Sequence, residues 1–149
     1  MSAFKTGLSV AALLALAAVG CGRGDLPELG EVHGKVTMDG EPLSNVLVQF
    51  YSEAGGRPGT GVTDAEGNYE LTYVDGAKGA KIGPNKVEIS TVWPDGEPPP
   101  GEKDKIPSQY NTKSTLKKEV QAGDNQFDLD LNSAEANPQG QAGQQYVDP

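Results

Sequence analysis

The sequence predicts an all-β domain, a β-sandwich of about seven short strands, over residues 31–131. Apolar and polar residues alternate there in short runs, which is the period of a half-buried strand. The chain contains 20 Gly and 11 Pro, and such turn-forming residues separate the runs. Helix-favouring runs are almost absent after residue 20. Short strands spaced by turns over about 100 residues are typical of a sandwich.

Each predicted strand has an apolar-rich face and a polar face. In the first strand, Val32, Gly34, Val36 and Met38 share one face, whereas His33 lies on the other face with Lys35 and Thr37. The later strands repeat this alternation, ending with Phe127, Leu129 and Leu131 on one face. The strands are expected over residues 32–38, 46–51, 61–63, 69–73, 87–91, 116–120 and 127–131.

Turns and breaks between these strands have recognisable chemistry. Asp39-Gly40 predicts a tight turn, because Gly accepts a positive φ and Asp bonds its own backbone. The segment 64–68 must reverse the chain, with Asp64 capping the turn and Gly67 in the left-handed position. Residues 94–105 include three consecutive prolines, which exclude a central strand. Residues 132–149 lack apolar periodicity and are expected to be a disordered tail.

The first twenty residues have the pattern of a secretory signal peptide and predict a signal helix. Lys5 precedes an unbroken apolar run, Leu8 to Val19, which is too short to span a bilayer. Ala18-Val19-Gly20-Cys21 then resembles the lipobox of bacterial lipoproteins. That resemblance implies cleavage before Cys21, an S-diacylglyceryl group on its thiol and an N-acyl group on the new terminus. The alternative is an ordinary signal peptide followed by a stray cysteine. Residues 21–30 are expected to be a lipidated flexible tether.

Charge and cysteine content exclude several classes of function. The formal net charge is −9, and removal of Lys5 with the signal peptide leaves 11 basic and 21 acidic residues. An acidic surface repels phosphate backbones, so nucleic acid is excluded as an expected partner. It also disfavours polybasic attachment to anionic lipids. Cys21 is the only cysteine, so no disulfide can form within the chain.

The domain also resembles a known family. The relevant segments are Gly34-Lys35-Val36, Asp39-Gly40-Glu41-Pro42-Leu43, Val46-Leu47-Val48-Gln49-Phe50 and Thr63-Asp64-Ala65-Glu66-Gly67-Asn68-Tyr69-Glu70-Leu71. They resemble the carboxypeptidase regulatory-like domain. Ile106-Pro107-Ser108-Gln109-Tyr110-Asn111, Ser114-Thr115-Leu116 and Asn125-Gln126-Phe127-Asp128-Leu129 are similar to the C-terminal half of small planctomycete-type lipoproteins. The resemblance implies a transthyretin-like or immunoglobulin-like Greek-key sandwich that is non-catalytic.

The catalytic candidates are few. His33 is the only histidine, and a Ser or Cys nucleophile normally needs a histidine base. His33 falls on the polar face of a strand, which favours a solvent-facing residue over a catalytic one. We therefore expect no catalytic residue, no cofactor-binding residue and no cofactor. The scarcity of His and Cys also argues against a zinc site.

Calcium is the metal that best suits the acidic residues. Asp64 and Glu66 share one turn, and Asp124, Asp128 and Asp130 lie near the last strand. However, Asp64 has a role in its turn, Asp128 and Asp130 alternate as a solvated strand face should, and no Asp-x-Asp-x-Asp-Gly loop is present. We expect no metal ligand here, and calcium stays an alternative.

Three aromatic residues are candidates for a binding surface. Trp93, Tyr110 and Tyr73 can stack on a sugar or a peptide, but in a domain with few large side chains we expect them to fill the core or cover its ends. The sequence thus predicts an exported, non-catalytic accessory or interaction module, anchored through Cys21 to a membrane of the cell envelope. Its expected partner is an envelope polymer or protein. The alternative is a carbohydrate- or peptide-binding envelope protein, which exposed, clustered aromatic side chains would favour.

Overall fold

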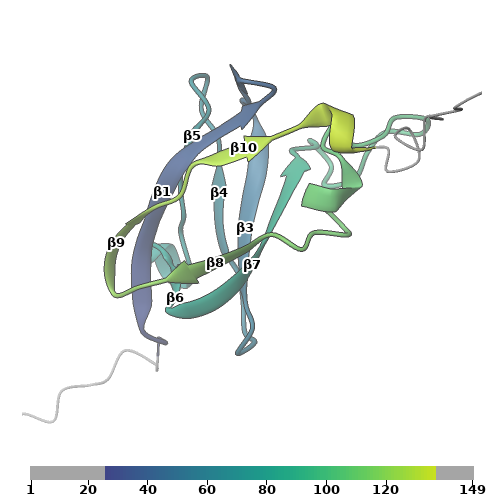
Figure 1. Ribbon diagram of the computed structural model, residues 1–149. Helices are drawn as coiled ribbons and strands as arrows, with labels where there is room; N and C mark the ends of the chain where they lie inside the picture. The colour runs from purple at the N-terminus through teal and green to yellow at the C-terminus, as the bar shows by residue number, and fades with distance from the viewer. Residues whose placement is uncertain (1–25, 137–149) are drawn as a thin grey trace, which may run out of the picture.

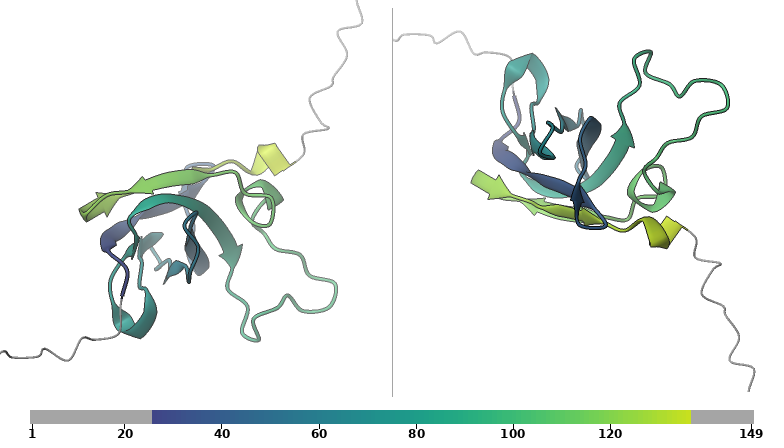
Figure 2. Two further views of the ribbon diagram at one scale, coloured as in Figure 1. Left: turned by 90° about the horizontal axis from the view of Figure 1, so that it is seen from below. Right: turned by 90° about the horizontal axis from the view of Figure 1, so that it is seen from above.

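The computed structural model describes residues 26–136, which are nearly all β. Two sheets pack face to face, consistent with the predicted β-sandwich (Figures 1 and 2). The predicted signal peptide, Cys21, most of the tether and residues 137–149 lie outside the described range. From 26 to 136, no helix has the length and apolar character needed to cross a membrane. The strands are β1 (Leu29–Met38), β2 (Glu41–Pro42), β3 (Val46–Ser52), β4 (Gly59–Val62), β5 (Asn68–Glu70), β6 (Ala80–Lys81), β7 (Gly83–Thr91), β8 (Lys117–Val120), β9 (Gly123–Gln126) and β10 (Leu129–Leu131).

Strand β1 is the centre of the first sheet. Along one edge it pairs in antiparallel fashion with β6, β5 and β2 in turn. Along the other edge it pairs in parallel with β9 and then β10. The ladder is interrupted between β9 and β10, where the Phe127 amide donates to the His33 carbonyl at 2.8 Å. A Cβ on Gly34 would lie 2.0 Å from the Phe127 carbonyl oxygen, so this close approach requires glycine.

The second sheet is antiparallel, with the strand order β4-β3-β7-β8. Its inward face comes from alternate residues of β3 and β7, such as Val48, Phe50, Val87 and Ile89, all of which are buried. Across the sandwich they meet Val32 and Val36 of β1, in the same cluster as Tyr69 and Leu71. The predicted alternation is therefore confirmed in the strands that build the core.

The two sheets are joined at both sides. On one side, Thr60 of β4 and Thr72 exchange two backbone hydrogen bonds of 2.9 and 2.8 Å. On the other side, the chain turns from β8 into β9, and the buried side chain of Asn125 fastens this corner. Its amide nitrogen donates to the carbonyls of Glu31 and Gln121, each at 2.9 Å. Its amide oxygen accepts from the Gln121 backbone at 2.8 Å.

The chain begins and ends its described course at opposite ends of the sandwich (Figure 1). The near end is where Leu29 pairs with Lys81 and Gly83 pairs with Val120. The far end is where β1 finishes and the backbone amide and hydroxyl of Ser133 both bond to the carboxylate of Asp39. Thr91, the last residue of β7, also lies at the far end, because it pairs with Val46 at the start of β3. A strand of ten residues spans about 33 Å, which sets the separation of the two ends.

Several segments differ from the sequence-based expectation. The seven predicted strands correspond to β1, β3, β4, β5, β7, β8 and β10, while β2, β6 and β9 were not predicted. Their sequences are short and carry no alternation, so only pairing with β1 makes them strands. The prediction that the disordered tail begins at residue 132 is wrong for residues 132–136. Ser133–Ala136 form a 3₁₀ helix, and Asp39 and Tyr110 hold residues 132 and 133 against the domain.

Similarly, strand β1 begins at Leu29, within the segment 21–30 that was expected to be a tether. Leu29 and Gly30 pair with Lys81 and Ala80, so the folded domain includes them. The tether before the first strand is correspondingly shorter than predicted.

The turn before β5 matches its predicted geometry. Gly67 has a φ of 81°, and its amide donates to the Asp64 carbonyl at 3.1 Å. Its own carbonyl accepts from the Val36 amide at 2.8 Å, so the turn is docked on β1. A Cβ on Gly67 would lie 2.6 Å from the Val36 carbonyl oxygen. Both the backbone conformation and the available space therefore demand glycine.

Gly67→Val should destabilise the domain far more than Glu66→Ala. Backbone strain at positive φ costs about 1–3 kcal/mol, and the clash with Val36 adds about 1–3 kcal/mol. Glu66 is exposed and contributes its backbone amide to Asp64, which alanine retains, so its loss should cost within about 0.5 kcal/mol. Urea and thermal unfolding of both variants, with calcium and with a chelator, measure the difference. Equal unfolding midpoints for Gly67→Val and wild type would contradict the turn, and an effect of Glu66→Ala confined to calcium would revive a metal role.

Candidate functional site

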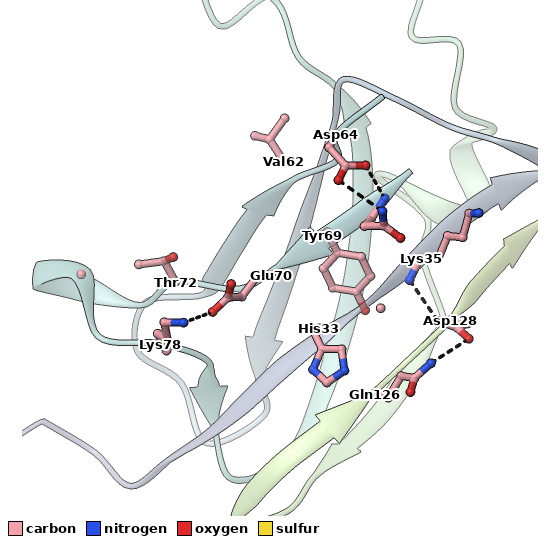
Figure 3. Close-up of a pocket in the computed structure, with 13 residues that line it drawn as sticks. His33, Lys35, Val62, Asp64, Tyr69, Glu70, Thr72, Lys78, Gln126 and Asp128 are labelled. Atoms are coloured by element: carbon pink, nitrogen blue, oxygen red, sulfur yellow. Dashed lines mark hydrogen bonds and ion pairs between the residues drawn. The ribbon is translucent and has the colours of Figure 1, made fainter. Parts of the chain in front are cut away.

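A broad hollow lies over the outer face of the first sheet and reaches Val62 of β4 at its edge (Figure 3). It is a shallow groove of about 870 Å³. Adjacent strands supply its polar lining because outward residues of paired strands lie side by side. In register, Glu70 of β5 pairs with His33 of β1, which pairs in turn with Gln126 of β9. Lys35 and Asp128 continue the groove toward the far end.

Most charged side chains of this groove form ion pairs or hydrogen bonds with neighbouring residues. Lys78 contacts Glu70 at 2.5 Å, and the Nδ1 of His33 lies 3.0 Å from a carboxylate oxygen of Asp124. Asp128 accepts hydrogen bonds from the Lys35 backbone amide at 3.0 Å and from the Gln126 side chain at 3.3 Å. The His33 side chain is 43% exposed, which confirms its predicted place on the polar face. Such paired, exposed groups are typical of a solvated sheet face.

Tyr69 forms the buried floor beneath these groups. Its hydroxyl donates to the Phe127 carbonyl at 2.7 Å. Burial raises the pKa of Tyr69, and the nearby Asp128 carboxylate raises it further. The hydroxyl therefore stays protonated and holds the break between β9 and β10, and it is not available as a base at neutral pH.

Four of the five candidate calcium ligands are used in separate structural contacts, and the fifth, Glu66, is exposed. Asp64 accepts from the backbone amides of Glu66 and Asn68 at 3.0 and 2.8 Å, so it caps its turn as predicted. Asp130 accepts from the Thr37 hydroxyl at 2.6 Å, while Asp124 contacts His33. Among residues 26–136, no group of three or more His, Cys, Asp or Glu is placed to hold a metal ion. The turn and the last strands do not combine their carboxylates into one site.

Asp104 was not predicted to have a role, yet it is the most heavily bonded carboxylate of the described chain. One oxygen accepts from the Thr91 hydroxyl at 2.7 Å and the Ile106 amide at 2.9 Å. The other accepts from the Asn111 side chain at 2.8 Å, and both lie 3.2 Å from the Thr91 amide. These bonds tie the end of β7 to the end of the proline-rich segment. We call residues 92–103, between the two tied ends, the clasped loop.

The clasped loop and the outer face of the second sheet enclose a smaller hollow of about 410 Å³, the Trp93 pocket. Leu47 pairs with Val62 on one side and with Ser90 on the other, so these three residues form a row across the sheet. Trp93 and Pro98 line the pocket from the loop. Val62 is 50% exposed, one of the two most exposed large apolar residues in the described range.

The three predicted aromatic candidates do not form one surface. Tyr110 packs against the core, and its hydroxyl accepts from the Asn132 amide at 3.1 Å. Tyr73 lines a different hollow, with Arg57 and Thr60. Trp93 is half-buried and lies outside the buried cluster, so it does not fill the core, which was the first of the two places expected for these aromatic residues. The core is filled instead by Phe50, Tyr69 and Leu71.

No family model matches the chain, and no curated protein matches it. Among solved structures, the chain is similar to a DUF3823 family protein from Parabacteroides merdae, with 16% sequence identity and a TM-score of 0.39. The similarity covers 72% of this chain and 47% of that one, so the chain spans about half the length of the protein it matches.

The hydrogen bonds of the Asp64 carboxylate should make the free energy of unfolding depend on pH in the acid range. Its hydrogen bond with the Asn68 backbone, the largest favourable cause, holds the pKa of Asp64 below its ordinary value of 3.8. The ionised carboxylate therefore stabilises the fold above about pH 4, and this contribution is lost as pH falls through the lowered pKa. Asp64→Asn should be less stable than wild type at pH 7, and the difference should shrink toward pH 2.5. Urea unfolding across this range measures it, with Asp95→Asn in the exposed loop as the control. A difference that stays constant with pH would contradict the cap.

Proposed function

We propose that this protein is a lipid-anchored component of the cell envelope whose sandwich domain is a non-catalytic accessory or interaction module. The observation that carries the proposal is Cys21, which follows the signal-like apolar run and precedes the first strand by only seven residues. A thioether-linked diacylglyceryl group together with an N-acyl chain supplies the multiple chains that stable anchoring needs. The acidic character of the chain supports a covalent anchor over a polybasic one.

The domain would then stand close to the bilayer, tethered at its near end. An extended chain spans at most about 3.6 Å per residue, so the eight steps from Cys21 to Leu29 reach about 30 Å. The near end, where β1 begins, faces the membrane in this arrangement. The far end, with the clasped loop and residues 132–136, faces away from it. Partners in the envelope would therefore meet the far end first.

The pairing of ionisable groups supports a non-catalytic role. His33, the only histidine in the chain, is bonded to Asp124 on an open sheet face, and the hydroxyl nearest the groove floor, that of Tyr69, is committed to the Phe127 carbonyl. A transthyretin-like, carboxypeptidase regulatory-like fold is part of the same proposal, resting on the turn and strand motifs of the sequence. Resemblance to that family implies an accessory role for the domain.

One observation favours the second candidate, a carbohydrate- or peptide-binding envelope protein. Trp93 lines a pocket at the far end instead of filling the core. Aromatic side chains in such positions commonly anchor ligands. The two candidates are compatible, because an anchored module that binds an envelope polymer satisfies both.

Cys21→Ser should abolish membrane association, because serine cannot form the thioether. Cell fractionation should find the variant as unprocessed precursor or as soluble protein, and radiolabelled palmitate should no longer be incorporated. Gly22→Ser, one residue later, is the matched control and should remain in the membrane fraction. If Cys21→Ser is processed normally and sediments with membranes, the anchor is wrong.

His33→Ala should leave the domain close to wild type. The His33–Asp124 pair is exposed on both sides, so its loss should change the free energy of unfolding by about 0.5 kcal/mol or less. Chromogenic ester, amide and glycoside substrates, tested with wild type and variant, measure any activity. A reproducible wild-type activity that disappears in His33→Ala would restore the enzyme alternative.

A further inference from the structure

The Trp93 pocket has two walls with a space between them, as a ligand site has and a packed core does not. One wall is the row formed by Val62, Leu47 and Ser90 on the outer face of three strands. The other is the clasped loop, where the Gly96 amide donates to the Trp93 carbonyl at 3.0 Å and closes a turn. The bonds of Asp104 hold the two ends of the loop together. The pocket is therefore built into the structure, and its volume is in the usual range for small-ligand sites.

The polar groups of the pocket favour an uncharged, hydroxyl-rich ligand. Asp104, the only charged residue that lines it, already accepts from Thr91, Ile106 and Asn111. Within residues 26–136, neither the indole N–H of Trp93 nor the hydroxyl of Ser90 makes a hydrogen bond, so both can bond to a ligand. The clasped loop carries three acidic residues, Asp95, Glu97 and Glu102, and one basic residue, Lys103, so its net charge is negative and disfavours an anionic ligand.

We propose that the Trp93 pocket binds a neutral saccharide chain. A sugar ring presents an apolar face to the indole and to Leu47 and Val62, while its hydroxyls meet the Trp93 N–H and Ser90. The position at the far end fits such a partner, because a domain anchored through Cys21 turns this end toward the envelope polymers. The inference rests on the second candidate function and narrows it to a neutral saccharide, whereas the lipid anchor bears only on the direction that the pocket faces.

The single tryptophan makes the test direct, because intrinsic fluorescence reports on Trp93 alone. The full-length chain, purified in detergent, is titrated with maltohexaose, cellohexaose and tetra-N-acetylchitotetraose, and with hexagalacturonate as the charged counterpart. We expect at least one neutral oligosaccharide to change the Trp93 emission saturably and hexagalacturonate to have no effect. Because lipidation is not needed for this titration, a failure here leaves the anchor untouched, and loss of the anchor leaves the titration interpretable.

Two variants locate the binding. Val62→Asp retains the tryptophan signal and places a carboxylate in the pocket at an exposed position, so it should weaken binding about tenfold or more. Trp93→Ala, followed by calorimetry, should lose binding, while Tyr51→Ala on the same sheet should retain it. No response to the three neutral oligosaccharides would overturn the proposal, as would binding that Val62→Asp leaves unchanged. A third variant lacks residues 137–149. If this deletion shifts the Trp93 emission in the absence of sugar, the chain's own C-terminal segment occupies the pocket, and the saccharide proposal is also overturned.

Discussion

The pairing of β1 along both of its edges is the constraint on which the remaining structure depends. Five short strands are held in place by this one strand, and four of them contain three or fewer paired residues. On its inward side, Gly34 faces the carbonyl of Phe127, where a Cβ does not fit, while Val32 and Val36 fill the core. The turn at Gly67, the corner at Asn125 and the break at Phe127 are each bonded to β1. A change in its register would therefore disturb every other element of the first sheet.

The Trp93 pocket lies on the second sheet, and the carboxylate of Asp104 holds in place the loop that forms one of its walls. The carboxylate of Asp104 bonds to Thr91 at the end of β7, so the two ends of the proline-rich loop are held together, while residues 94–103 between them are exposed and project from the sandwich (Figure 2). The resulting pocket and the polar groove of the first sheet differ in chemistry. The groove has many charges that neutralise one another, whereas the pocket has an indole, aliphatic side chains and one fully bonded carboxylate. Apolar surface with unused hydrogen-bonding groups is what a ligand can exploit.

The strands of the core could be predicted because alternation is a local signal. Val46, Val48 and Phe50 are buried as their spacing indicates, and Asp64 and Gly67 form the turn that their chemistry indicates. The strand β9 could not be predicted, since Gly-Asp-Asn-Gln lacks alternation and is ordered by the edge of β1 about ninety residues earlier. Trp93 was expected to fill the core or to cover its ends on residue type alone, and Asp104 had no local motif. Both acquire their roles from the return of the clasped loop, which depends on contacts distant in sequence.

The parallel pairing of β1 with β9 and β10 also determines when the domain can become complete. The bonds from Lys35 to Asp128 and from Thr37 to Asp130 close a separation of 93 residues. Loops of that size slow folding, because their closure entropy is lost before the contacts form. The first sheet can therefore be completed only when almost all of the chain is present. Under the export proposed above, such a delay would postpone completion of the first sheet until translocation is nearly finished.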